Sequence, residues 1–233
     1  MEAGSIAHKN AHEREREGTM SGTAFCSWSG GKDSCLALYK ALKEGCEARY
    51  LLTIMSEEGG SRSHGISEGL LSEQSEKLGM EMIRRRASWD NYEKEFLGAL
   101  RELKRKGVEC GVFGDIDTQE HLDWVARVCK TAGMQYLEPL WKHDRTDVLR
   151  EFIDAGFRAI IVSCDGNRMG EGYLGRDLTL GLADELRSIN VDPAGEYGEY
   201  HSFVYDGPIF RERIEFKAGG VRRNKNYLFL EIE

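Results

Sequence analysis

The chain has 233 residues, of which 40% are hydrophobic and 31% charged, and its formal net charge at pH 7 is −8. This composition is ordinary for a globular protein with one sizeable core, and it excludes fibrous and disordered chains. No stretch approaches the ~18 uninterrupted apolar residues of a membrane-spanning helix, and the acidic balance argues against a broad nucleic-acid-binding face.

The N-terminal segment 1–22 is polar and lacks the apolar core of a secretory signal. We therefore expect a disordered leader over these residues and a cytoplasmic protein. None of the six cysteines forms a C-x-x-C pair, which excludes the usual signatures of zinc ribbons and thioredoxin-type redox sites. Several of them lie in apolar runs, where a reduced thiol behaves as a small core side chain.

From residue 23 onward, short apolar runs alternate with amphipathic segments. The apolar runs predict buried strands at 24–28, 50–55, 110–114 and 158–164, with weaker candidates at 81–85 and 135–141. Helical periodicity predicts helices over 33–45, 67–79, 90–107, 119–133 and 146–156. Such alternation is typical of an α/β fold with a doubly wound, mostly parallel sheet, and we expect this domain to span 23–190.

The pattern changes after about residue 190. The segments 200–206, 211–217 and 226–233 alternate or run apolar, with turn residues between them at 206-DGP-208 and 219-GG-220. We expect antiparallel strands here, which form a small β-rich subdomain over 191–233.

The segment 29-SGGKDS-34 follows the first predicted strand and opens the first predicted helix. Gly30 and Gly31 let the backbone approach an anion closely, the free N–H groups of the helix point at the same place, and Lys32 adds positive charge. The spacing fits neither G-x-x-x-x-G-K-[ST] nor G-x-G-x-x-G. We therefore predict an anion site at the carboxyl edge of the sheet that is neither a Walker A loop nor a dinucleotide fingerprint.

The stretch S-G-G-K-D-S resembles the PP-loop of the ATP pyrophosphatases, which have an adenine nucleotide alpha hydrolase-like (HUP-type) fold. The segment 192-DPAGEYGEYHSFVYDGPIF-210 resembles the E-x-G-E-[FY]-x-[ST]-F-V motif of diphthine–ammonia ligases and their paralogues. The segment 172-GYLGRDL-178 resembles a further part of that family at Gly175 and Arg176. The resemblance covers about residues 23–210.

This resemblance implies that ATP adenylates a carboxylate with release of pyrophosphate, and that ammonia or an amine then displaces AMP to form an amide. The implied cofactors are ATP and Mg²⁺, and the acceptor used by the ligases is diphthine on translation elongation factor two. The sequence departs from the ligases at Tyr197, where they usually carry Gly, and over 112–129. These departures leave the acceptor open, and a homodimer remains one option for the oligomeric state.

The resemblance and the sheet-edge rule together nominate the site residues. We expect catalytic roles for Lys32, Asp33, Glu196 and Glu199. We expect nucleotide contacts from Ser29, Gly30, Gly31, Lys32, Asp33, Ser34, Thr53, Met55, His64, Gly114, Asp115 and Arg176. The candidate Mg²⁺ ligands are Asp33 and Asp115.

Several of these residues have a second interpretation. Asp33 could instead be an acid favoured by the helix dipole, and His64 a solvated loop histidine. Glu196 and Glu199 could converge on a cationic group, act as a base on ammonium, or be turn acids without a partner. Arg176 could bind phosphate or the acceptor carboxylate, or form a structural salt bridge. The role of His201 is open.

Three other functions compete with amide ligation on diphthine. A PP-loop enzyme could act on another small-molecule acceptor. A tRNA-thiolating enzyme would normally need paired cysteines and a basic face, and this sequence has neither. A nucleotide-sensing module would bind ATP or AMP without releasing pyrophosphate.

Overall fold

The computed structural model describes residues 22–57, 59–61 and 64–233. The predicted leader, except for Gly22, therefore lies outside the described residues. Within the described ranges, no helix is long and apolar enough to cross a membrane.

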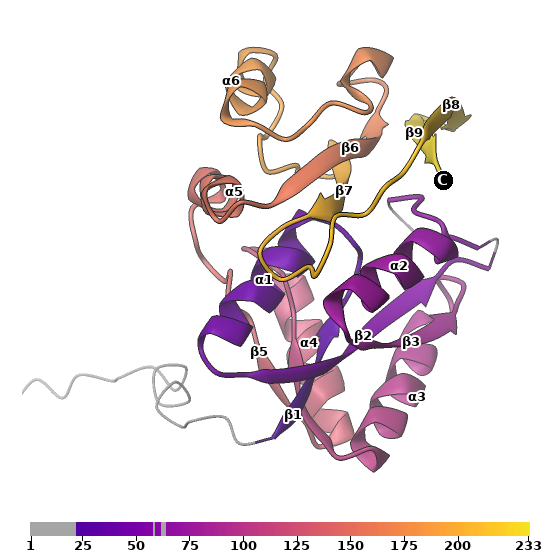
Figure 1. Ribbon diagram of the computed structural model, residues 1–233. Coiled ribbons are helices and arrows are strands. Elements are labelled where there is room, and N and C mark those ends of the chain that lie inside the picture. Colours follow the sequence, from indigo (N-terminus) through magenta and orange to yellow (C-terminus); the bar gives the residue numbers. More distant parts are fainter. Residues whose placement is uncertain (1–21, 58, 62–63) are drawn as a thin grey trace, which may run out of the picture.

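Five parallel strands form the first sheet, in the order β3–β2–β1–β4–β5 (Figure 1). They are β1 (Thr23–Ser27), β2 (Glu47–Met55), β3 (Glu81–Arg86), β4 (Val108–Val112) and β5 (Gln135–Leu137). The strand order reverses direction between β1 and β4, so the carboxyl ends of these two strands flank the point where doubly wound folds bind ligands. The predicted α/β fold is confirmed.

Amphipathic helices cover both faces of this sheet. They are α1 (Lys32–Lys43), α2 (Glu68–Leu78), α3 (Tyr92–Arg105) and α4 (Gln119–Ala132). On one face, Phe96 and Leu100 of α3 pack with Val125 of α4 in one core cluster. On the other face, Leu36 of α1 and Leu71 of α2 belong to a larger core that continues into the second half of the chain. Helices α1 and α2 therefore lie between the parallel sheet and the second half of the chain.

A separate antiparallel sheet occupies the second half, in the order β7–β6–β9–β8. Its strands are β6 (Arg158–Asp165), β7 (Tyr200–Asp206), β8 (Ala218–Asn224) and β9 (Tyr227–Ile232), and it is accompanied by α5 (Arg145–Asp154), the short 3₁₀ helix η2 (Glu171–Tyr173) and α6 (Leu180–Ser188). Figure 1 shows β6 and β7 beyond α1, on the side away from α3 and α4. The predicted antiparallel β-rich unit is present.

Three predictions about this half were wrong. The strand over 158–164 lies in the antiparallel sheet, so the division between the sheets falls before β6 and not near residue 190. An apolar run buried on both faces does not reveal which neighbours it will pair with. The segment 211–217 is not a strand, and Gly219 and Gly220 lie within β8, where the register shifts. The turn between β8 and β9 forms instead at Lys225, which has a φ of 53°.

The short helix α6 was not predicted from the sequence. It has nine residues, begins after Thr179 and contains Gly181 near its start. The Thr179 side chain accepts a hydrogen bond from the N–H of Leu182 and caps the helix. A nine-residue helix with an internal glycine has weak periodicity, so its cap and its packing decide its conformation.

Candidate functional site

The loop between β1 and α1 presents polar hydrogens at the carboxyl end of β1. Gly30 has a φ of +81°, a conformation that favours glycine. Gly31 is the N-cap of α1 and supplies no capping side chain, so the first turn of the helix is left open toward this edge of the sheet. The hydroxyl of Ser29 accepts a hydrogen bond of 3.2 Å from the N–H of Gly31 and lies 3.1 Å from the hydroxyl of Ser34. This arrangement suits a phosphate group.

Strand β7 of the second sheet lies directly against this loop. The N–H of Lys32 donates to the hydroxyl of Ser202 over 3.1 Å, and the N–H of Val204 donates to the carbonyl of Gly30 over 3.0 Å. The motif near residue 200 and the glycine loop, far apart in the sequence, are therefore two walls of one site.

A cavity of about 250 Å³ opens between these walls. This volume suits a pyrophosphate group together with the parts of the substrates that react beside it. Its lining comes from the loop and the start of α1, from the segment after β2, and from β7 and the turn before it: Ser29, Lys32, Asp33, His64, Gly195, Glu196, Gly198, Tyr200, His201 and Ser202. The structure thus brings together five of the predicted site side chains.

Lys32 is the cation of this cavity, and its side chain is almost fully buried. Its Nζ lies 2.8 Å from Oδ2 of Asp33 and 3.8 Å from Oε1 of Glu196. Burial opposes the charge on Lys32, but the carboxylates of Asp33 and Glu196 outweigh it and hold the pKa of Lys32 above its usual range. Lys32 is therefore charged at neutral pH.

Burial has the dominant effect on Glu196. It raises the pKa of this carboxyl group to about 7, although the charge of Lys32 acts in the opposite direction. A carboxyl group with such a pKa exchanges its proton near physiological pH, as a general base or acid requires.

Two histidines meet in the same cavity. The rings of His64 and His201 lie 4.7 Å apart between centroids. Burial lowers the pKa of His201 to about 4, and the Lys32 charge adds to this effect. Burial, together with His201 and Lys32, holds the pKa of His64 well below its usual range. Both imidazoles are therefore neutral at pH 7, and each can donate one hydrogen bond and accept one.

The segment after β4 supports the loop from behind. A Cβ atom at Gly114 would lie 2.9 Å from the backbone carbonyl of Asp33, so only glycine fits between β4 and the first turn of α1. Asp115 pairs with His121 at 3.0 Å and does not line the cavity. Gly114 therefore contacts the loop through its backbone, and the nucleotide contacts expected of Gly114 and Asp115 and the Mg²⁺ role expected of Asp115 stay predictions.

Glu199 does not line the cavity, in contrast to the catalytic role expected for it. Its side chain is 0% exposed and pairs with Arg168 over 2.9 Å. Its carboxylate also accepts the N–H of Tyr197 over 2.9 Å and the N–H of Asp192 over 3.4 Å. These contacts give Glu199 a structural role: it holds the turn that carries Glu196 to the cavity.

Three further predicted nucleotide contacts also lie off the cavity wall. Arg176 forms a bidentate ion pair with Glu185, at 2.8 and 2.7 Å, which is the structural alternative considered for it. The hydroxyl of Thr53 donates to the carbonyl of Trp28 over 2.8 Å, and the side chain of Met55 is buried in the core. The segment 53–65, which carries the expected nucleotide contacts Thr53, Met55 and His64, includes residues 58 and 62–63, which lie outside the described residues. These nucleotide contacts stay predictions.

Besides His201, whose role was open, the structure adds three side chains that were not among the predicted site residues. Tyr200 and Ser202 line the cavity, and Gln74 of α2 lies behind the loop. Tyr200 and Ser202 occupy motif positions that were noted but given no role. For Gln74 a signal existed in the sequence, because an amide on the same helix face as Leu70, Leu71 and Leu78 is a polar group at a core position.

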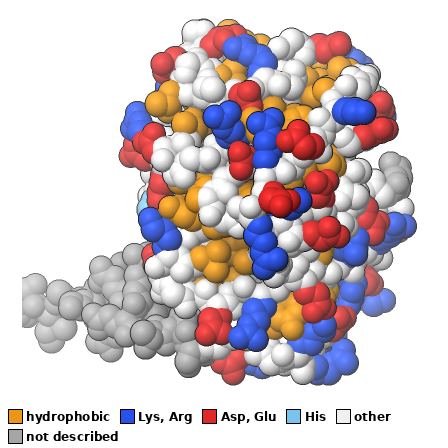
Figure 2. Space-filling model, viewed as in Figure 1, with side chains coloured by type: hydrophobic (Ala, Val, Ile, Leu, Met, Phe, Trp, Pro, Cys, Tyr) orange, Lys and Arg blue, Asp and Glu red, His pale blue; other side chains and the backbone are white. Residues whose placement is uncertain are grey.

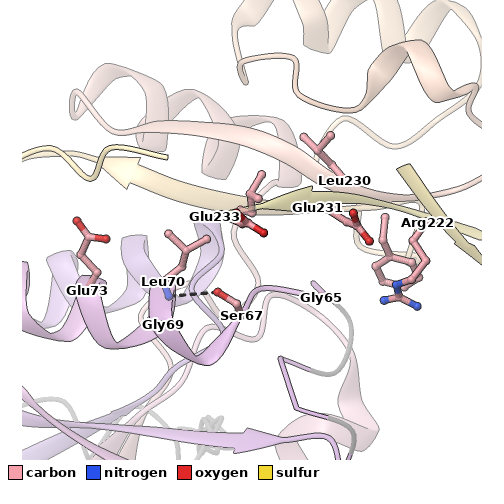
Figure 3. Close-up of a pocket in the computed structure, with 11 residues that line it drawn as sticks. Gly65, Ser67, Gly69, Leu70, Glu73, Arg222, Leu230, Glu231 and Glu233 are labelled. Atoms are coloured by element: carbon pink, nitrogen blue, oxygen red, sulfur yellow. Dashed lines mark hydrogen bonds between the residues drawn. The ribbon is translucent and has the colours of Figure 1, made fainter. Parts of the chain in front are cut away.

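A second and larger cavity, of about 700 Å³, lies between α2 and β9 (Figure 3). Figure 3 shows Glu73 on one side and Glu231 and Glu233 on the other, and Arg222 is the one cationic residue among the described residues that line it. None of the predicted site residues lines this cavity. The described lining has three carboxylates and one guanidinium, which disfavours a polyanion, so the smaller cavity is the candidate nucleotide site.

The charges of the site fit a phosphate ligand better than a resident metal. Among the described residues, no group of three or more His, Cys, Asp or Glu side chains could hold a metal ion. One orphaned oxygen does lie at the loop, because Oδ1 of Asp33 is buried and has no hydrogen-bond partner among the described residues. A single carboxylate of this kind fits Mg²⁺ that is held mainly by phosphate oxygens and water.

The face shown in Figure 2 has basic and acidic side chains interspersed, without a broad basic patch. This distribution agrees with the acidic balance of the sequence and gives no support to a tRNA-binding face on this side of the molecule.

Comparisons with known proteins agree with the two-part architecture. The family profile described as the diphthamide synthase N-terminal domain matches residues 22–136, and that of the diphthamide synthase C-terminal domain matches residues 144–233. The boundary between the two profiles coincides with the division between the parallel and antiparallel sheets.

The curated relatives described below are both named diphthine–ammonia ligase. The chain is 28% identical over 211 residues to the diphthine–ammonia ligase of Schizosaccharomyces pombe, a match that covers 80% of this chain and 34% of that protein. It is 26% identical over 212 residues to the diphthine–ammonia ligase of Mus musculus, covering 80% and 79%. The chain thus spans about a third of the length of the yeast relative and most of the length of the mouse one.

Among solved structures, a predicted subunit of a tRNA methyltransferase from Methanocaldococcus jannaschii is similar, with a TM-score of 0.45 and 17% identity. The match covers 82% of this chain and 99% of that one. This likeness is too distant to carry a functional argument.

Proposed function

Since the chain belongs to the diphthamide synthase family, we propose that it is an ATP-dependent ligase that converts a carboxylate to an amide. In the first step the acceptor carboxylate attacks the α-phosphorus of ATP, which gives an acyl-adenylate and pyrophosphate. In the second step ammonia attacks the acyl carbon, and AMP leaves with the electron pair of the broken C–O bond.

The observation that carries this proposal is the meeting of Lys32 and Glu196 across one cavity, at 3.8 Å. Lys32 comes from a loop suited to phosphate, and Glu196 comes from the motif that resembles the ligases. An anion-binding group and a proton-accepting group at this separation suit a reaction that releases pyrophosphate at one wall and consumes ammonium at the other.

Pyrophosphate release requires groups that stabilise negative charge without rearranging. The open first turn of α1, the hydroxyls of Ser29 and Ser34, and the buried charge of Lys32 are held in place before substrate arrives. Such pre-organised donors stabilise charge that develops on phosphate oxygens. When bound with the nucleotide, Mg²⁺ would neutralise phosphate oxygens, and Asp33 is the residue that would hold it.

Glu196 is the candidate base of the second step. Ammonium has no lone pair and must lose a proton before it can attack a carbon atom. A carboxylate with a pKa of about 7 accepts that proton and releases ammonia into the cavity. The neutral imidazoles of His64 and His201 can accept hydrogen bonds from ammonia without competing for its proton.

The acceptor that we propose is diphthine on translation elongation factor two, by analogy with the names of the relatives. Tyr197, next to Glu196, is 71% exposed and packs its ring 4.3 Å from the guanidinium of Arg145. Arg145 is itself held by Asp117 and Asp192. A fixed, exposed ring beside the catalytic carboxylate is therefore placed to contact the acceptor at the position where the sequence departs from the ligases.

All six cysteines are buried free thiols, which supports our proposal that the protein works in a reducing compartment such as the cytoplasm. Light scattering on the purified protein would distinguish a monomer from a homodimer.

The decisive experiment combines the purified protein with ATP, Mg²⁺, ammonium and elongation factor two that carries diphthine. We expect AMP and pyrophosphate in equal amounts, together with the mass shift of a carboxylate converted to an amide. Lys32→Ala protein is the matched negative control. ATP binding without acceptor-dependent release of pyrophosphate would overturn the proposal and favour a nucleotide-sensing module.

A further inference from the structure

Gln74 of α2 is fully buried, and its amide joins three parts of the site. Its Oε1 accepts a hydrogen bond of 2.9 Å from the indole N–H of Trp28. Its Nε2 donates to the carbonyl of Gly30 over 3.0 Å and to the carbonyl of Val204 over 2.7 Å. Two carbonyls face the NH₂ group and one N–H faces the oxygen, so these partners leave only one orientation for the amide.

The contact with Gly30 controls the direction of a loop peptide. The carbonyl of Gly30 and the N–H of Gly31 belong to one planar, trans peptide unit and point in opposite directions. Gln74 and the N–H of Val204 hold the carbonyl of Gly30 on the side of the loop that faces α2 and β7, which we call the outer side. The N–H of Gly31 consequently points to the opposite, inner side, where it donates to the hydroxyl of Ser29.

A reversed peptide would place a carbonyl oxygen where the loop otherwise presents an N–H group. Glycine pairs permit such a reversal because they adopt positive and negative φ with similar ease. The oxygen would repel a phosphate group at short range. Retaining the anion-binding conformation therefore requires a partner for the Gly30 carbonyl on the outer side of the loop.

Gly30 and Gln74 also fit each other sterically. A Cβ atom at Gly30 would lie 2.7 Å from Oε1 of Gln74, closer than such atoms approach. Two features therefore require glycine at position 30: its φ of +81° and the close approach of the Gln74 amide.

We propose that Gln74 is a positioning residue that holds the Gly30–Gly31 peptide in the orientation that binds the pyrophosphate part of ATP. The same amide ties this loop to β7 through Val204, two residues after the Ser202 hydroxyl that accepts the N–H of Lys32. The inference rests on one part of the proposed function, namely that the loop between β1 and α1 binds pyrophosphate.

Gln74→Met tests this role, because methionine has a similar length and no hydrogen-bonding amide. We expect the dissociation constants of inorganic pyrophosphate and of ATP to rise about tenfold, as expected when a charge-assisted contact is misdirected. We expect the dissociation constant of AMP to stay within about twofold, because AMP lacks the phosphates that this loop would hold. A general loss of structure would weaken binding of AMP as well.

Ser75→Ala is the matched control. Ser75 is the neighbouring buried residue of α2, and its hydroxyl donates to the carbonyl of Met80, away from the loop. We expect this variant to lose thermal stability while it retains wild-type affinity for pyrophosphate, ATP and AMP. If Gln74→Met is folded and binds pyrophosphate as the wild type does, the inference is wrong.

Trp28→Phe keeps the inference testable if Gln74→Met does not fold. It removes the indole N–H that steadies Oε1 of Gln74, together with part of a buried ring, and keeps the Gln74 amide. We expect about threefold weaker pyrophosphate binding with unchanged binding of AMP. Unchanged pyrophosphate affinity in Trp28→Phe would then overturn the inference. These binding measurements need no acceptor. If no amide product forms, the proposed reaction is wrong. The role of Gln74 is tested separately, by the binding of pyrophosphate, ATP and AMP.

Discussion

The backbone N–H of Lys32 donates a hydrogen bond of 3.1 Å to the hydroxyl of Ser202, which lies 170 residues further along the chain. This bond joins the start of α1 to β7 and makes the two halves of the chain into one site. It also occupies an N–H group in the first turn of α1, the part of a helix where such groups lack partners within the helix.

Ser202→Ala removes the hydroxyl acceptor from this pair. We expect the free energy of unfolding to fall by about 1–2 kcal/mol, because the buried N–H of Lys32 is left without a partner. The affinity for ATP should fall as well. Thermal unfolding and equilibrium binding measure the two effects, and Ser202→Thr, which keeps a hydroxyl, is the control. Unaltered stability of Ser202→Ala would show that the bond contributes nothing.

Lys32→Ala should abolish acceptor-dependent exchange of pyrophosphate into ATP, with a loss of at least ~100-fold. The variant removes the cation that would stabilise the phosphate oxygens and leaves the partly buried carboxylates of Asp33 and Glu196 to repel them. Lys40→Ala is the control on the same helix. Lys40 pairs with Glu151 at 2.8 Å, away from the cavity, and its loss should change exchange less than about twofold. Exchange that survives in Lys32→Ala would rule out the loop as the pyrophosphate site.

The two glutamates of the motif should respond differently to the same change. Glu199→Gln should lower the free energy of unfolding by about 2 kcal/mol, because it removes the charge that Arg168 and two backbone N–H groups recognise. Its affinity for ATP should stay near that of the wild type. Glu196→Gln should fold normally and bind ATP but form no amide. Chemical denaturation and product analysis separate the two, and a stability loss confined to Glu196→Gln would reverse the assignments.

The rate of amide formation should rise between about pH 6 and pH 8 and then level off. Glu196, with a pKa of about 7, must be ionised to take a proton from ammonium, and its ionisation is complete above that range. The histidines should contribute no step, because the pKa of His201 is about 4 and that of His64 is well below its usual range. A rate that keeps rising toward pH 9 would mean that free ammonia from solution is the substrate and that Glu196 is not the base.

The same raised pKa predicts a pH dependence of stability. A carboxyl group whose pKa is higher in the folded protein than in the unfolded chain favours folding most below the unfolded value, near 4.5, and loses this contribution as the pH rises to about 7. At pH 8, Glu196→Gln should therefore be more stable than the wild type, by on the order of 2 kcal/mol, and at pH 4 the difference should vanish. Urea denaturation at both pH values measures it.

Gly114→Ala should damage the site through the backbone. Its Cβ atom would lie 2.9 Å from the carbonyl of Asp33 and would displace the first turn of α1. We expect weaker ATP binding and a loss of ~2 kcal/mol in stability. Gly98→Ala is the control, because Gly98 lies inside α3 and a Cβ atom there meets nothing within 4 Å. That variant should be stabilised by up to ~1 kcal/mol, and equal effects of the two changes would contradict the packing argument.

Much of the fold could be predicted from local patterns. The helices α1 to α5 begin and end within about three residues of their predicted bounds, because amphipathic periodicity and terminal glycines act over a few residues. The partners of β6 could not be predicted, because its apolar run suits either a parallel or an antiparallel neighbour. The strand expected over 211–217 failed for the related reason that alternation alone does not supply a pairing partner.

The candidate site divides in the same way. The anion loop, with its glycines, its lysine and its helix start, is recognisable from six consecutive residues, because backbone freedom and the unpaired N–H groups of a first helical turn are local properties. The separate roles of Glu196 and Glu199 are not local, although only three positions separate them. One side chain enters the cavity beside Lys32, and the other is buried against Arg168. Only the packing of the second sheet against α1 and α2 brings Glu196, Ser202 and Gln74 to the loop, because contacts between distant segments depend on how whole elements bury their apolar faces.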